Sequence, residues 1–165
     1  MAYELYVTVE GKTQGKFKGE IATALHKDKI GGLSFEYEVQ SPRDPATGQA
    51  SGKHRHSAIT IVKEWGAATP QLFQALVTNE VLPKVTFEFF QVSRGTGKEE
   101  AFYRITLTDA GVSMIKQFTA APGTPSGSKH GAAEGHELEA VSFAFQKIQV
   151  EHLLAKTAAQ DDWKS

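Results

Sequence analysis

The stretch HKDKIGGLSFEYEVQSPRDPATGQASGKHRHSAITIVKEWGAATP, residues 26–70, decides the fold. Residues 34–41 alternate between apolar and polar side chains, which is typical of a strand with one face toward a core and the other toward water. The apolar face carries Phe35, Tyr37 and Val39, and the polar face carries Ser34, Glu36, Glu38 and Gln40. Residues 57–64 predict a second strand, and Thr69-Pro70 predicts the start of a helix.

Between the two strands, residues 42–56 form a long polar segment rich in Pro, Asp, Thr, Gly and Ser. These residue types favour turns, and a loop of about fifteen residues is long for a compact domain, where such loops are usually functional or disordered. The segment also carries charged and titratable side chains, namely Arg43, Asp44, Lys53, His54, Arg55 and His56. We therefore expect this loop to contact something beyond its own domain.

Composition places the chain among ordinary globular proteins. Its 165 residues predict one domain, with a core over about 1–153 and a polar tail over 154–165 that we interpret as a frayed helix or disordered. The net charge of −1 argues against general nucleic-acid binding, and the absence of cysteine excludes disulfides and thiolate metal sites. The start, MAYELYVTVEGK, lacks a signal-peptide pattern, and no apolar run is long enough for membrane insertion.

Further strands are predicted by alternation at residues 2–10, 83–92, 102–119 and 137–152. The pattern slips at Phe89-Phe90, which suggests a bulge or burial on both faces, and Asp109-Ala110-Gly111 predicts a bend. Residues 120–136 have the composition of a surface loop. Strands without alternating helices predict an antiparallel sandwich or closed barrel with one appended helix.

The helix is expected over residues 69–80, with Thr69 as its N-cap, Pro70 at its first position and Pro83 beyond its end. One side carries the apolar residues Leu72, Phe73, Leu76 and Val77. Since a three-turn amphipathic helix cannot form a core alone, we expect these side chains to pack on the sheet.

None of the residue clusters predicts catalysis, a cofactor or a metal ion. His54 and His56 share one face of a strand, as metal ligands need, but the sequence offers no second ligand cluster, so we favour a solvated or interface pair. The glycine-rich segments 95–98 and 123–131 lack the strand–loop–helix context of a phosphate loop. Glu36 and Glu38 are interpreted as charged residues on the solvent-facing side of a strand. The G-x-S-x-G motif of serine hydrolases is absent from the sequence.

Four blocks of sequence nevertheless resemble one protein family. They are residues 26–39, 41–76, 102–116 and 136–152, of which SPRDPATGQASGKHRH and VSFAFQKI are the most specific. In these blocks, which span nearly the whole chain, the sequence is similar to the Hcp (haemolysin-coregulated protein) family, the tube component of bacterial type VI secretion systems.

The resemblance implies a β-barrel with a flanking helix that assembles into homohexameric rings, which stack into a tube. It implies contractile sheath proteins and a spike tip protein as partners, and small effectors carried in the lumen. It also implies a protein without enzymatic activity, made in the bacterial cytoplasm and secreted without a cleaved signal peptide. Because the chain ends at Ser165, we expect no appended toxin domain.

Two sets of site residues follow from this resemblance. The polar face of Ser34, Glu36, Glu38 and Gln40 is expected to line the lumen, where Glu36 matches a channel-lining position of the family. Contacts between subunits or stacked rings are expected from Arg43, Asp44, Lys53, His54, Arg55 and His56. Two alternatives stay open from sequence: a monomeric barrel that binds a small ligand, and a metal-dependent hydrolase built around His54 and His56.

Overall fold

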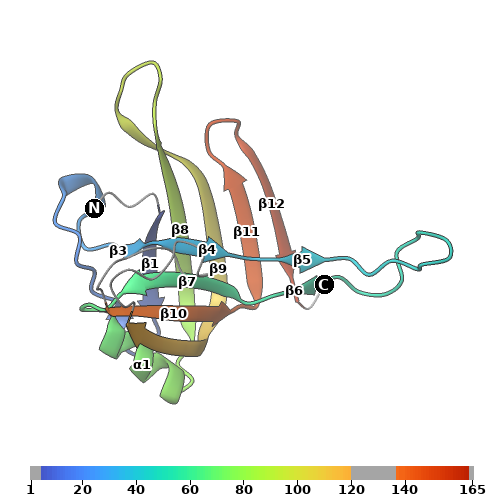
Figure 1. The fold of residues 1–165 in the computed structure, drawn as a ribbon, viewed down its shortest axis with the longest axis horizontal. Helices are drawn as coiled ribbons and strands as arrows, with labels where there is room; N and C mark the ends of the chain where they lie inside the picture. Colours follow the sequence, from blue (N-terminus) through green and yellow to red (C-terminus); the bar gives the residue numbers. More distant parts are fainter. Residues whose placement is uncertain (1–4, 120–136, 164–165) are drawn as a thin grey trace.

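The computed structural model describes residues 5–119 and 137–163, so the loop expected at 120–136 lies outside the described residues. The described part is mainly β, with one α-helix, α1 (Thr69–Val77), and one 3-10 turn, η1 (Ala24–His26). Every strand pair in it is antiparallel, which confirms the predicted fold class (Figure 1). Within these ranges no helix has the length and hydropathy to cross a membrane.

The strands form one large bent sheet and one short hairpin. The first half of the large sheet contains β1 (Leu5–Gly11), β2 (Gly15–Lys16), β3 (Ile30–Gly32), β8 (Leu82–Val92), β11 (Lys147–His152) and β12 (Thr157–Asp162). Its second half contains β4 (Ser34–Glu36), β7 (Ile59–Glu64) and β10 (Glu137–Ala144). The long strand β9 (Glu99–Thr119) belongs to both halves, and β5 (Val39–Gln40) pairs with β6 (Arg55–His56) apart from them.

Strand β9 connects the two halves because it bends near its middle. Its first part pairs with β8 and β11, and its last part pairs with β10. At the bend, Asp109 adopts a positive φ of 49°, and the N–H of Gln146 donates to the carbonyls of Thr108 and Asp109. The predicted bend is therefore confirmed, and the predicted strand 137–152 is present as β10 and β11 on the same edge of β9, interrupted at 145–146.

Alternation along the strands accounts for the core. In β1, Leu5, Val7 and Val9 face inward, and in β8 the buried set includes Val85 and Phe87. The pairing of β8 with β9 shifts register between Phe89 and Phe90, which confirms a bulge at the predicted slip. The main hydrophobic cluster joins both halves of the sheet and α1, and a smaller one contains Val62, Leu138 and Ala140.

Helix α1 packs on this core with a different face from the one predicted. Leu72 and Ala75 are buried, whereas Phe73 is 58% exposed and Val77 53% exposed. The expectation that all four large apolar residues face the sheet is therefore wrong for Phe73 and Val77. The small side chains of Ala68 and Ala75 are fully buried and complete the stripe around Leu72, a size pattern that a search for large apolar residues overlooks.

Both ends of α1 also differ from the prediction. The N-cap is Ala68, which offers no side-chain hydrogen bond, while the Thr69 hydroxyl donates to Glu139 Oε1 at 2.8 Å. The helix ends at Val77, three residues before the predicted end, and Pro83 lies inside β8. Asn79 follows with a φ of 51°, a left-handed conformation that commonly terminates helices.

The interpretation of the tail as a frayed helix or disordered is wrong for Thr157–Asp162. This segment is β12, which pairs along its full length with β11 and forms one edge of the sheet. Its side chains show no apolar alternation, so the strand is held by backbone pairing rather than by burial of an apolar face.

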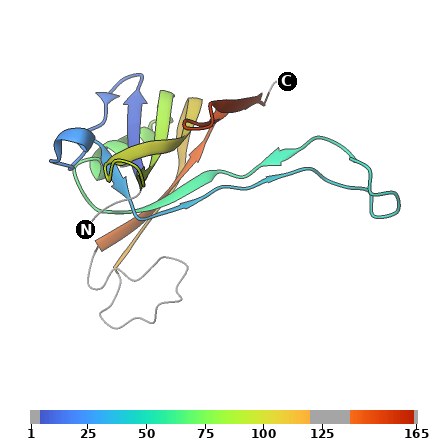
Figure 2. The same cartoon turned by 90° about the horizontal axis from the view of Figure 1, so that it is seen from above.

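The predicted loop is a two-stranded arm, which we define as residues 38–57. It extends away from the sheet in both ribbon views (Figures 1 and 2). Backbone pairing continues along it through Val39 with His56, Gln40 with Arg55, and a bridge between Arg43 and Ala50. Its tip is closed by Asp44, whose Oδ1 accepts the N–H of Ala46 at 2.8 Å.

Candidate functional site

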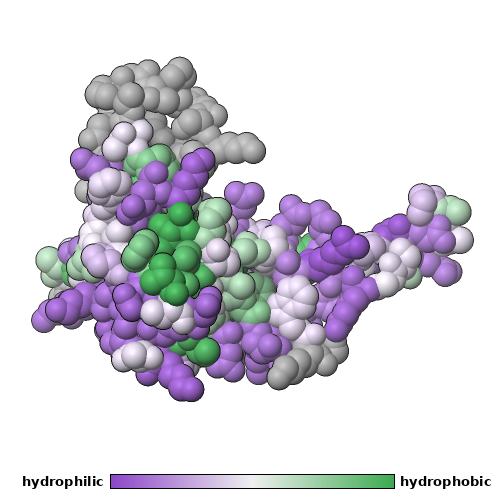
Figure 3. All heavy atoms as spheres, turned by 90° about the horizontal axis from the view of Figure 1, so that it is seen from below, coloured by the Kyte–Doolittle hydropathy of each residue, from purple (hydrophilic) through white to green (hydrophobic). Residues whose placement is uncertain are grey.

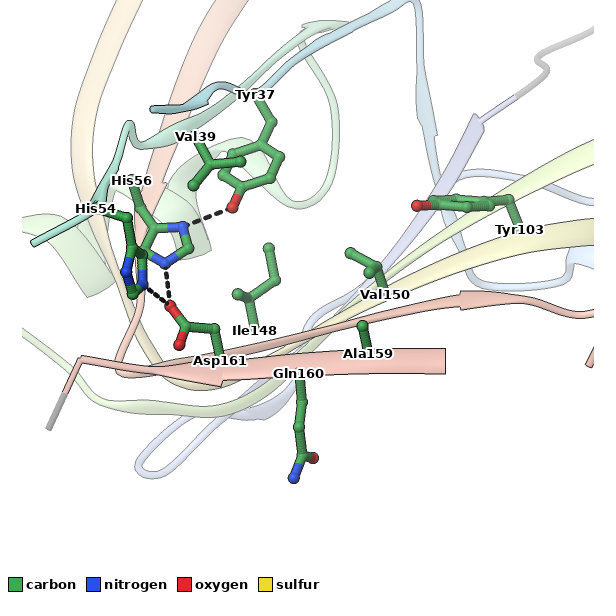
Figure 4. Close-up of a pocket in the computed structure, with 10 residues that line it drawn as sticks. All are labelled: Tyr37, Val39, His54, His56, Tyr103, Ile148, Val150, Ala159, Gln160 and Asp161. Carbon is green, nitrogen blue, oxygen red and sulfur yellow. Dashed lines mark hydrogen bonds and ion pairs between the residues drawn. The ribbon is translucent and has the colours of Figure 1, made fainter. Parts of the chain in front are cut away.

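At the base of the arm, strand β6 and the residues before it lie against the last strand, β12. His54 and His56 point to the same side of the arm because they are two residues apart on an extended segment. The Nε2 atom of each lies 2.5 Å from Oδ2 of Asp161, so one carboxylate oxygen contacts both imidazoles (Figure 4). We call these three residues the clasp.

The clasp is partly shielded from water. The His56 side chain is 6% exposed, whereas those of His54 and Asp161 are 39% and 29% exposed. The hydrogen bonds from His56 and then His54 lower the pKa of Asp161 to about 2. This carboxylate is therefore ionised at any physiological pH.

Tyr37 orients His56 from the other side. Its hydroxyl lies 2.6 Å from His56 Nδ1, and Figure 4 shows it pointing at the ring from the segment between β4 and β5. Burial, followed by the negative charge of Asp161, raises the pKa of Tyr37. The tyrosine thus remains protonated and fixes the imidazole plane so that Nε2 faces Asp161.

A hollow of about 420 Å³ adjoins the clasp. Its walls are largely apolar and come from the arm and from strands β9, β11 and β12, and they include Val39, Tyr103, Ile148 and Val150. The exposed Val39 therefore faces a hollow rather than the core, which corrects the expectation that it lies with Phe35 against the core.

The six residues predicted for contacts between subunits differ in what they do within the chain. His54 and His56 belong to the clasp, and Lys53 Nζ donates to the carbonyl oxygen of Trp163 at 3.2 Å. Asp44 closes the tip of the arm. The remaining two, Arg43 and Arg55, have exposed side chains on the arm.

The four residues predicted for the lumen lie along one run but on two different elements. Ser34 and Glu36 are on β4, whose neighbour β7 places Thr60 opposite Glu36. Glu38 and Gln40 belong to the arm, where the amide of Gln40 donates to the carboxylate of Glu38. The carboxylates Glu36 and Glu38 are exposed, and the assignment of this run to a lumen stays a prediction.

Sequence reasoning missed Asp161 and Trp163. Asp161 lies 107 residues after His54, in a segment interpreted as an unstructured tail, so no local spacing connects it to the histidines. The one signal in the sequence was the adjacent pair Asp161 and Asp162, which could supply an acidic partner for His54 and His56. In the structure the partner is Asp161. Among the described residues, the donor atoms of His54, His56 and Asp161 converge as metal ligands do.

Comparison with known proteins identifies the family of this fold. The family model described as "Type VI secretion system effector, Hcp" matches residues 6–152. A protein of Pseudomonas aeruginosa named "Major exported protein" is 32% identical over 174 aligned residues, which cover 100% of this chain and 98% of the relative. The chain belongs to the Hcp family.

Solved structures agree with this membership. One described as "Crystal structure of Hcp protein" superposes with a TM-score of 0.84 at 27% identity, covering 98% of this chain and 100% of the other. "Secreted protein Hcp3 from Pseudomonas aeruginosa" gives 0.78 at 27% identity over 99% and 100%. The resemblance seen in the four sequence blocks is confirmed, and these superpositions cover nearly the whole chain.

Proposed function

We propose that this Hcp protein is the ring-forming subunit of a type VI secretion tube. Six copies close into a ring, rings stack into the inner tube, and a contractile sheath and a spike tip act with it during export. The proposal is supported by membership of the Hcp family over residues 6–152 and by a relative named as an exported protein.

The arm is the feature that carries this proposal. Its outer part is exposed, and the hairpin extends away from the body of the same chain (Figure 2). An isolated two-stranded hairpin is only marginally stable in water, so an arm of this length gains most from a second surface to lie on. A neighbouring copy supplies such a surface, with Arg43 and Arg55 as polar contacts.

A second exposed surface supports assembly. Phe73 and Val77 are one turn apart on α1, and both side chains are more than half exposed. The view onto the face that carries α1 shows apolar side chains gathered there (Figure 3). Exposed apolar groups of this kind mark contact sites, so we assign this face of α1 to a contact with another subunit of the assembly.

The lumen is assigned to the polar run of Ser34, Glu36, Glu38 and Gln40. Six copies of the exposed carboxylates Glu36 and Glu38 produce an acidic band, which favours small effectors with a basic surface. Glu36→Arg is therefore expected to preserve the rings and change effector retention. Unchanged retention of every effector would remove this assignment.

The decisive experiment is a mass measurement by size-exclusion chromatography with light scattering. We expect a species of about six times the 18.0 kDa chain mass, and electron microscopy should show rings. Arg43→Ala combined with Arg55→Ala is expected to shift the protein toward smaller species, whereas Lys98→Ala, in the exposed turn between β8 and β9, serves as a control. A monomer at high concentration would contradict the proposal and favour the ligand-binding barrel.

A further inference from the structure

We propose that the clasp of His54, His56 and Asp161 is a binding site for a divalent transition-metal ion, with Zn²⁺ as the matching ion. The site fastens the arm to strand β12. It stands independently of ring formation, because all three donors belong to one chain.

The donor set is that of a metal site. Nε2 of His54, Nε2 of His56 and one carboxylate oxygen of Asp161 all lie within 4.8 Å of one another. Two imidazole nitrogens and one carboxylate suit zinc and its neighbours in the transition series, whereas Mg²⁺ and Ca²⁺ prefer sites made of oxygen alone. The Asp161 carboxylate supplies the oxygen ligand of this set.

The geometry requires only a small adjustment. Tetrahedral zinc ligands at the usual bond lengths stand about 3.3 Å apart, compared with 2.5 Å between each histidine nitrogen and the Asp161 oxygen. Asp161 and His54 are partly exposed and His56 is buried, so we assign the adjustment to Asp161 and His54 and take His56 as the fixed ligand.

Tyr37 supports both the empty and the metal-bound form of His56. In the empty form, the Nε2–H of His56 donates to Asp161 and the Tyr37 hydroxyl donates to Nδ1. With a metal on Nε2, the proton sits on Nδ1 and donates to the Tyr37 oxygen, because a phenol hydroxyl both donates and accepts. Hydrogen bonds of this kind to the second ring nitrogen are the common support of metal-bound histidines.

Three protein ligands leave one position of a tetrahedral ion open. The site lies at the rim of the apolar hollow, and the more exposed His54 side leaves room for a water molecule as the fourth ligand. The other described histidines are engaged differently: His152 Nδ1 accepts the N–H of Ala155, and His26 is buried in a stack with Tyr6. The convergence at the clasp is thus specific to His54 and His56 among the described histidines.

The test is calorimetric titration of the metal-stripped full chain with ZnCl₂. We expect one zinc ion per chain at the clasp, a decrease of about 10–100-fold in affinity for Tyr37→Phe, and a larger decrease for Asp161→Asn and His54→Ala. Asp162→Asn, which changes the adjacent carboxylate, is the matched control and should bind like the wild type. Zinc should also raise the melting temperature of the wild type more than that of Asp161→Asn.

Absorption spectra of the Co²⁺-loaded chain give a second readout, because tetrahedral nitrogen and oxygen ligation produces intense visible bands that Asp161→Asn should lose. Circular dichroism establishes that each variant is folded. The proposal is overturned if the wild type binds neither ion, or if Asp161→Asn and His54→Ala bind zinc as the wild type does. A chain that binds zinc but remains monomeric would sustain this site while contradicting ring formation.

Discussion

Two carboxylates, Glu139 and Asp161, each hold one segment of the chain in place, but in opposite surroundings. Glu139 is fully buried and accepts hydrogen bonds from Lys63 Nζ at 2.6 Å and from the Thr69 hydroxyl at 2.8 Å, which ties the start of α1 to strands β7 and β10. Asp161 is partly exposed and is contacted by the imidazoles of His54 and His56. The Glu139 cluster is sealed from water, whereas the clasp at Asp161 is only partly shielded.

The difference teaches which part of the molecule is fixed. A buried ion pair without water tolerates no loss of a partner, since the remaining charge cannot be solvated. Removing one side chain of the partly exposed clasp costs little stability, since water solvates the groups that remain. The packing of α1 on the sheet is therefore fixed, whereas the arm is held by contacts that water, an ion or a neighbouring chain can replace.

The largest effect is expected when the sealed cluster is broken. Glu139→Gln leaves the Lys63 ammonium buried without a counter-charge, and we expect a loss of about 3–5 kcal/mol in the free energy of unfolding. Urea denaturation measures it. The matched double variant Lys63→Met with Glu139→Leu should recover most of the loss, and a cost below about 1 kcal/mol for Glu139→Gln would contradict the contrast drawn here.

A third carboxylate, Glu80, lies between these extremes. It is nearly buried and accepts the N–H groups of Thr13 and Gln14 and the Gln14 amide. Burial acts to raise its pKa, but these hydrogen bonds together outweigh burial and lower it below the ordinary 4.5. We expect Glu80→Gln to cost about 1–3 kcal/mol at neutral pH.

The pH dependence of this cost follows from its sign. Because the folded pKa of Glu80 is lowered, its contribution is complete above the unfolded pKa near 4.5 and is lost as the pH falls through the folded pKa. The difference in unfolding free energy between wild type and Glu80→Gln should therefore shrink below pH 4.5. A difference that stays constant from pH 7 to pH 3 would show that the charge of Glu80 plays no part.

A smaller effect on stability is expected at the open clasp. Asp161→Asn removes the charge that holds His54 and His56, and we expect a cost of about 1 kcal/mol in global stability because the group is partly exposed. Hydrogen exchange should instead report faster exchange in the arm, residues 38–57, while β8 and β9 remain protected. Equal acceleration in the arm and in those strands would indicate that the clasp is as fixed as the buried cluster.

The smallest effect is expected for Lys53→Ala. Lys53 is exposed, and its contact is one hydrogen bond to the carbonyl of Trp163. Loss of this bond should change stability by less than about 0.5 kcal/mol. A thermal melt compares it with Asp161→Asn, and a larger loss for Lys53→Ala than for Asp161→Asn would reverse the order of importance at the base of the arm.

Much of the sheet could be predicted because alternation reports burial on one face. It located β1, β8 and β9, and it registered the bulge at Phe89-Phe90 and the bend at Asp109 as breaks in phase. Strand β12 could not be found in this way, because an edge strand held by backbone hydrogen bonds carries no apolar alternation. The face of α1 was misassigned because burial there follows small residues such as Ala75.

The site was predictable only in part for a related reason. The histidine pair was visible as two titratable side chains on one face of a strand, but its partner comes from β12, which is distant in sequence. Tyr37 was assigned to an apolar face, although its hydroxyl contacts His56. Contacts between remote segments are set by the tertiary fold, so composition and spacing do not reveal them.

The remoteness of the clasp partners also orders events in time. The arm is synthesised first, and the carboxylate that receives it follows 107 residues after His54. At typical rates of synthesis of about 5–20 residues per second, about 5 to 20 seconds pass before Asp161 exists. During that interval the arm of a nascent chain lacks its contact with Asp161. The bonds from His54 and His56 to this carboxylate therefore form among the last steps of folding.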